Sequence, residues 1–136
     1  MSEPFQDAPT TVLIADDDED ILELVSLGLS GHGYDLVLAR DGAAALATAR
    51  ERKPAVALLD VAMPELDGYE VTSALKNDPA TKDTVVILFT ARAQESAGEM
   101  GYAAGADDYI TKPFTLKTLQ TRVVAALEKA HGRTPS

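Results

Sequence analysis

Five short apolar runs, spaced along the chain, constrain the fold of this sequence more than any other feature. They cover residues 12–15, 36–39, 55–59, 85–89 and 109–110. Runs that are apolar at consecutive positions are typical of strands buried on both faces of a parallel sheet. Since helical patterns lie between the runs, the sequence predicts right-handed crossovers and an open, doubly wound α/β sheet with helices on both faces.

Apolar residues also recur at helical spacing between and after the runs. One stripe consists of Ile21, Leu24, Val25 and Leu29, and another of Leu116, Leu119, Val123 and Leu127. Asp67, followed by Glu70 three residues on, is a variant of the capping box. Asp41 and Thr115 precede other helical patterns and are predicted N-caps.

The 136 residues are enough for one compact domain. We expect this domain to span residues 11–130, with disordered tails at 1–10 and 131–136. The chain has no cysteine, which excludes disulfides, thiolate metal sites and a cysteine nucleophile.

Charge and hydropathy exclude further classes of partner. The formal net charge of −10 repels nucleic acid phosphates, and no basic stripe offsets it, so we expect no direct binding to nucleic acid. No apolar stretch approaches the roughly 18 to 20 residues needed to cross a bilayer. The first residues contain acids and a proline where a secretory signal needs basic and then apolar residues. A cytoplasmic protein without a membrane partner is therefore expected.

Polar residues follow the apolar runs at the positions where such sheets bind ligands, beyond the carboxyl ends of the strands. Aspartates 16–18 follow the first run, Asp60 the third, Thr90 the fourth, and Lys112 comes shortly after the fifth. Carboxylates brought this close together repel one another unless a cation neutralises them. Because the donors are all oxygens, the sequence predicts a hard ion, Mg²⁺, with Mn²⁺ as an alternative.

The same residues could supply the parts of a phosphoryl-transfer site. Such a reaction needs an in-line nucleophile and positive charge around the phosphoryl oxygens. Asp60 would be the nucleophile, the metal and Lys112 would supply the charge, and Thr90 would donate a hydrogen bond.

Four motifs, VLIADDDEDI, LLDVAMPELDGYE, VVILFTA and GADDYITKPF, resemble in order and spacing the receiver domains of two-component response regulators. The resemblance runs from about Thr11 to Ala130 and includes the stand-alone, chemotaxis-type receivers. It implies a flavodoxin-like fold with a five-stranded parallel sheet of order 2-1-3-4-5. Since no effector segment follows Ala130, we expect a stand-alone receiver, a relay intermediate or one piece of a larger protein.

The resemblance also implies a role for each candidate residue. Asp60 is the expected phosphoryl acceptor, and Asp16 and Asp17 are the acidic pair. The implied metal ligands are Asp17, Asp60 and the backbone carbonyl of Ala62, with Asp16 beside them. The implied switch residues are Thr90 and Tyr109, the phosphate-binding residue is Lys112, and the Lys112–Pro113 bond is expected to be cis.

The function that the resemblance implies is that of a signalling phosphoacceptor rather than an enzyme that turns over a substrate. A histidine kinase or a histidine phosphotransfer protein would phosphorylate Asp60, and slow hydrolysis would reset it. Movement of Thr90 and Tyr109 would then change a face formed by the fourth helix, fifth strand and fifth helix, which a downstream protein reads.

Three alternatives compete with this interpretation. The chain could be a receiver-like scaffold that is never phosphorylated. It could be a phosphatase of the haloacid dehalogenase type, with Asp16 as nucleophile and Asp18 as acid/base, although the acidic pair at 107–108 precedes Lys112 instead of following it. A nucleotide or flavin module would need a glycine- or hydroxyl-rich loop after the first run, where this chain has three aspartates.

Overall fold

The computed structural model describes residues 10–91 and 105–132 of the chain. Its strands are β1 (Thr10–Ala15), β2 (Tyr34–Ala39), β3 (Val56–Asp60), β4 (Val85–Ala91) and β5 (Asp108–Lys112). They pair in parallel in a single five-stranded sheet of order β2-β1-β3-β4-β5. The predicted fold class and strand order are confirmed.

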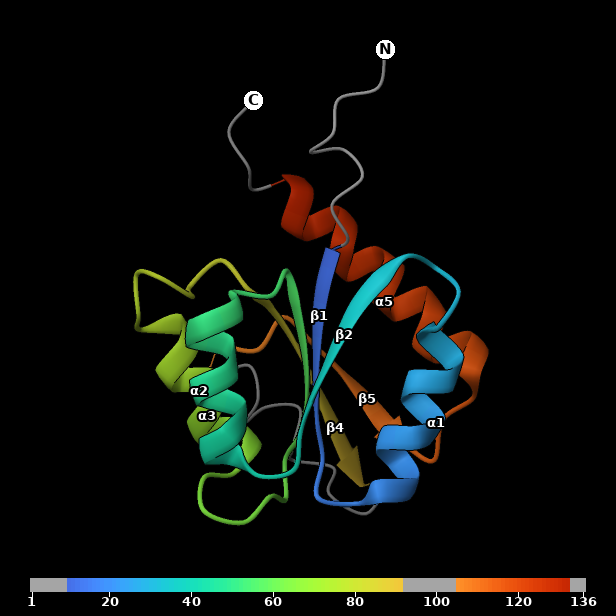
Figure 1. Cartoon of the computed structure of the whole chain (residues 1–136), viewed down its shortest axis with the longest axis horizontal. Coiled ribbons are helices and arrows are strands. Elements are labelled where there is room, and N and C mark those ends of the chain that lie inside the picture. Colours follow the sequence, from blue (N-terminus) through green and yellow to red (C-terminus); the bar gives the residue numbers. More distant parts are fainter. Residues whose placement is uncertain (1–9, 92–104, 133–136) are drawn as a thin grey trace.

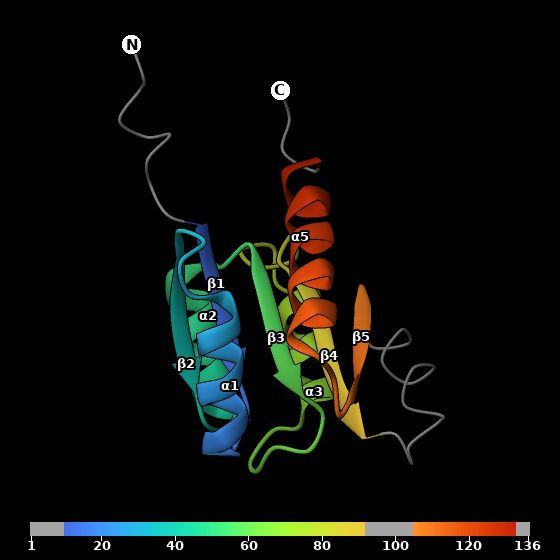
Figure 2. The same ribbon diagram turned by 90° about the vertical axis from the view of Figure 1, so that its right-hand side faces the viewer.

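Helices cover both faces of this sheet (Figures 1 and 2). They are α1 (Glu19–Leu29), α2 (Gly42–Arg52), α3 (Gly68–Lys76) and α5 (Leu116–Gly132). Figure 1 shows α1 and α5 on one side of the sheet and α2 and α3 on the other. A fourth helix of the kind implied by the resemblance would fall on residues 92–104, outside the described residues.

The core consists of two apolar layers, one on each face of the sheet. Along β1, Val12 and Ile14 pack in the layer with α1 and α5, whereas Leu13 and Ala15 pack in the layer with α2 and α3. Successive side chains of a strand point to opposite faces, so both faces of a central strand must be apolar. This explains why the runs show no polar alternation.

Side-chain caps fix where the helices begin. Asp41 accepts a hydrogen bond from the backbone N–H of Ala44 at 2.7 Å, and Asp67 and Glu70 form the reciprocal capping box. Thr115 accepts from the N–H of Thr118 at 3.0 Å, directly before α5. The three predicted caps are confirmed.

The first strand and the last helix extend slightly beyond the expected domain limits. Thr10 already belongs to β1 and α5 continues to Gly132, one and two residues into the expected tails. The remaining tail residues, 1–9 and 133–136, lie outside the described residues. Within the described parts of the chain, no helix is both long and apolar enough to span a bilayer.

Candidate functional site

Except for Tyr109, which lies near the amino end of β5, the predicted site residues lie at the carboxyl edge of the sheet. Asp16 directly follows β1, Asp60 is the last residue of β3 and Lys112 is the last residue of β5. Thr90 is the residue before the last in β4. Because all five strands are parallel, their carboxyl ends share one edge, and residues far apart in sequence meet there.

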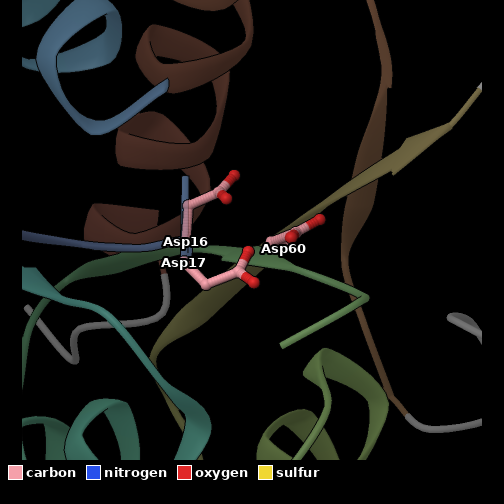
Figure 3. Close-up of side chains that lie close together, drawn as sticks. All are labelled: Asp16, Asp17 and Asp60. Atoms are coloured by element: carbon pink, nitrogen blue, oxygen red, sulfur yellow. The ribbon is translucent and has the colours of Figure 1, made fainter. Parts of the chain in front are cut away.

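Three carboxylates form the centre of this site. Asp16, Asp17 and Asp60 each offer an oxygen, and the three oxygens lie within 4.8 Å of one another. Figure 3 shows their side chains gathered at the ends of β1 and β3. Asp16 is fully buried and Asp60 is 6% exposed, whereas Asp17 is exposed to solvent. The cluster is therefore open to solvent on the side of Asp17.

Lys112 bridges two of the carboxylates. Its Nζ lies 2.9 Å from an oxygen of Asp16 and 3.2 Å from an oxygen of Asp60. The ammonium also lies 5.9 Å from the centre of the Phe89 ring, within the range of a cation–π contact. The Lys112–Pro113 peptide bond is cis, as expected.

Burial and the contacts with neighbouring groups affect the pKa values of both Asp16 and Lys112. Burial raises the pKa of Asp16, and the charge of Asp60 adds to this, while hydrogen bonds from the Asp18 N–H and from Lys112 oppose it. Burial alone would lower the pKa of Lys112, but Asp16 and Asp60 together raise it. The lysine is therefore held in its charged form, and Asp16 depends on nearby positive charge to remain ionised.

The donor set fits a hard divalent cation. Three carboxylates and one ammonium leave two formal negative charges in a partly buried cluster. All the available ligand atoms are oxygens, and one side of the cluster faces solvent, which suits an ion that keeps several waters. Asp16, Asp17 and Asp60 could thus hold Mg²⁺. Ala62 lies two residues after Asp60 and is exposed.

The loop after Asp60 is fixed at both ends by backbone contacts. Val61 donates its N–H to the carbonyl of Phe89 at 3.1 Å and accepts from Gly68 at 3.2 Å. A Cβ on Gly68 would lie 2.5 Å from the carbonyl oxygen of Asp60. Only glycine fits here, so Gly68 helps to place Asp60. The sequence identifies this glycine only as part of a motif, because no neighbouring residue indicates its close approach to the Asp60 carbonyl.

Thr90 and Tyr109, the predicted switch residues, lie on neighbouring strands. Thr90 is 3% exposed, and alternation along β4 places it on the same face as Leu88, in the layer with α2 and α3. Tyr109 is partly buried and packs against the same layer. The two side chains therefore belong to one face of adjacent strands, as a coupled movement would require.

Apart from Asp16, the acids invoked for the phosphatase alternative have structural contacts of their own. Asp18 is exposed, and its carboxylate caps α1 by accepting the N–H of Asp20 at 2.9 Å. Asp107 and Asp108 lie at the amino end of β5, opposite Asp60, where Asp108 pairs with Arg122. Asp107 and Asp108 therefore do not lie with Asp16 at the carboxyl edge of the sheet.

Comparisons with known proteins agree with this architecture. A profile of the response regulator receiver domain matches residues 12–124. The chain therefore belongs to the response regulator receiver family. Among solved structures, the chemotaxis response regulator CheY4 of Vibrio cholerae matches with a TM-score of 0.82 and 32% identity, over 88% of this chain and 99% of that one.

The similar curated proteins are longer than this chain. The alkaline phosphatase synthesis transcriptional regulatory protein PhoP of Bacillus subtilis (strain 168) is 38% identical over 125 residues, which are 92% of this chain and 51% of PhoP. The DNA-binding dual master transcriptional regulator RpaA of Synechocystis sp. is 40% identical over 118 residues, 87% of this chain and 49% of RpaA. The chain spans about half the length of the curated relatives it matches.

Proposed function

We propose that the protein is the phosphoacceptor of a two-component or phosphorelay system and receives a phosphoryl group on Asp60. The observation that carries this proposal is the contact of Asp60 with Lys112, 3.2 Å away, inside a cluster of three carboxylates. The donor class is a phosphohistidine, presented by a histidine kinase or a histidine phosphotransfer protein. The protein acts as a signalling phosphoacceptor and not as an enzyme with a released product.

The transfer is a displacement at phosphorus. An oxygen of Asp60 attacks, the P–O bond of an acyl phosphate forms, and the P–N bond of the phosphohistidine breaks, leaving the donor imidazole to keep the electron pair and take up a proton. Lys112 is close enough to Asp60 to supply positive charge to a phosphoryl oxygen. Because that lysine also contacts Asp16, its position is fixed before the donor arrives.

We assign the metal ligands to Asp17, Asp60 and the backbone carbonyl of Ala62, with Asp16 beside them. When bound, Mg²⁺, or Mn²⁺ in its place, neutralises the negative charge that gathers on the phosphoryl oxygens during transfer. The role of Asp16 is to hold Lys112 and to keep the cluster charged enough to retain the ion. Asp17 lies on the solvent-exposed side of the cluster, and the phosphohistidine donor approaches from this side.

The output step is assigned to Thr90 and Tyr109. A phosphoryl oxygen on Asp60 offers an acceptor to the hydroxyl of Thr90 at the same edge of the sheet. Movement of that side chain frees space on the face that Tyr109 shares, and a downstream protein partner reads the change. Converting a 1:99 equilibrium to 99:1 takes about 5.5 kcal/mol, so a partial shift of population is the expected response.

Intact-mass measurement tests the proposal. The parent chain, Asp60→Asn and a metal-chelated sample are each incubated with acetyl phosphate, with Mg²⁺ present in the first two. We expect one added phosphoryl group on the parent chain alone. Label that persists in Asp60→Asn but is lost in Asp16→Asn would contradict the assignment of the acceptor. No label from acetyl phosphate or phosphoramidate would favour a scaffold that is not phosphorylated.

A further inference from the structure

Gly42, the first residue of α2, lies against the backbone of the loop that comes after Asp60. A Cβ built on Gly42 would lie 1.8 Å from the carbonyl oxygen of Leu66 and 2.6 Å from its carbonyl carbon. The obstructing atoms belong to the main chain, so a change of rotamer cannot relieve the overlap. Any side chain at this position must displace either the start of α2 or the loop.

The same residue also holds the loop through a hydrogen bond. Its N–H donates to the carbonyl of Pro64 at 3.3 Å. The first N–H groups of a helix have no acceptor within the helix, so the loop supplies one. Asp41 caps this helix end independently, through the N–H of Ala44, and the start of α2 is therefore a fixed support.

The middle of the loop has a conformation that needs such support. Glu65 has φ of +73°, and Leu66 donates its N–H to the carbonyl of Pro64 at 2.9 Å, which closes a three-residue γ-turn. Positive φ is unfavourable for a residue with a side chain and persists only where the surroundings impose it. The side chain of Leu66 packs against the apolar layer below α2 and α3, which anchors this part of the loop.

We infer that Gly42 is a positioning residue for the phosphoacceptor site, although it touches none of its side chains. The loop is fixed to Asp60 at its ends by Val61 and Gly68, and Gly42 sets the position of its middle. Figure 1 shows the start of α2 and this loop at the same, lower edge of the sheet. Because Ala62 lies between these fixed points, the position of its carbonyl depends on α2. This inference rests on the proposed function.

The test compares Gly42→Ala with Ala49→Gly. Ala49 is fully buried on the same helix, seven residues further along, and its replacement weakens the helix without reaching the loop. Mg²⁺ is titrated into each protein while backbone amide NMR signals of residues 61–63 and 65–67 are followed, and urea unfolding reports stability. We expect Gly42→Ala to bind Mg²⁺ about tenfold more weakly and to shift the loop amides, as for residues that support metal ligands. Ala49→Gly should lose stability but keep its Mg²⁺ affinity.

The outcomes separate this inference from the proposed function. If Gly42→Ala keeps the parent affinity and changes only amides of the first turn of α2, then the helix moves and the inference is wrong. If Gly42→Ala does not fold, the Mg²⁺ titration of the parent chain still tests the inference. In the parent chain the amide of Gly42 is expected to shift with the same Mg²⁺ midpoint as the amides of residues 61–63 and 65–67, and a Gly42 amide that does not respond would overturn the inference. A parent chain that neither binds Mg²⁺ nor takes a phosphoryl group would overturn the proposed function itself.

Discussion

Replacement of Asp107 by asparagine should destabilise the protein at neutral pH and have little effect in strong acid. The carboxylate of Asp107 is 7% exposed and lies at the amino edge of the sheet. It accepts hydrogen bonds from Lys129 at 2.7 Å, from Lys76 at 2.9 Å and from the N–H of Val86 at 2.9 Å. These contacts tie α5, α3 and β4 to the residue before β5.

The size and sign of the effect depend on the pKa of this carboxyl. Burial alone would raise the pKa, but the hydrogen bonds from Lys129, Lys76 and Val86, with the charge of Lys76, outweigh burial and lower it from 3.8 to about 2. One pKa unit corresponds to about 1.4 kcal/mol, so the ionised form contributes about 2 kcal/mol to the free energy of unfolding. Because the pKa is lowered on folding, this contribution is complete above pH 3.8 and is lost as the pH falls toward 2.

Urea unfolding followed by circular dichroism, at several values between pH 7 and pH 2, measures this difference. Asp107→Asn should be less stable than the parent chain by about 2 kcal/mol at pH 7, and the two curves should converge in acid. Asp108→Asn is the matched control, since Asp108 is one-third exposed and its pair with Arg122 should contribute less than about 1 kcal/mol. A loss from Asp107→Asn that stays constant down to the lowest pH would refute the electrostatic explanation.

Three further substitutions test the site and the core. Lys112→Met should slow phosphoryl incorporation from acetyl phosphate by about a hundredfold, because it removes the ammonium beside Asp60, and an unchanged rate would contradict its role. Gly68→Ala should lower both the incorporation rate and the urea midpoint, since a Cβ would lie 2.5 Å from the carbonyl oxygen of Asp60, and parent-like values of both would refute the contact. Leu58→Ala, at a fully buried position of β3, should cost about 2–5 kcal/mol in the free energy of unfolding, and a loss below about 1 kcal/mol would show that the core closes over the cavity.

The sheet was predictable because its strands are apolar on both faces. Runs such as 56–59 leave few alternatives to a buried parallel strand, and turn residues such as Asp41 and Asp67 mark where the helices begin. The order of the strands was implied by the family resemblance and not by the apolar pattern. Positions after each run then identified Asp16, Asp60 and Lys112 as neighbours, since parallel strands share a carboxyl edge.

Strand ends were predicted less well, because backbone pairing and not hydrophobicity determines them. Apolarity marked only Tyr109 and Ile110 in the last strand, yet β5 runs from Asp108 to Lys112. This strand lies at the edge of the sheet, so its polar side chains remain partly exposed while its backbone pairs with β4. Lys112 is consequently part of the strand instead of coming after it.

Contacts that depend on tertiary structure could not be predicted. Asp107 and Asp108 are adjacent identical residues, yet one is nearly buried among three donors and the other forms a more exposed pair. Likewise, Gly42 is an unremarkable glycine after a cap, and its close approach to Leu66 exists only because α2 and the loop after β3 meet in space. No local pattern carries such information.

The ion pairs around Asp107 have a consequence for protein engineering. Together with the hydrogen bond from the N–H of Val86, they join α3, β4 and α5 to the residue before β5, at the edge of the sheet opposite Asp60. Substitutions at the amino edge of the sheet, for example at Lys76 or Lys129, should therefore change the thermal stability of the protein. They should leave the reacting groups at the carboxyl edge unaltered. Libraries that randomise the amino edge should thus yield variants that differ in heat resistance and keep the same chemistry.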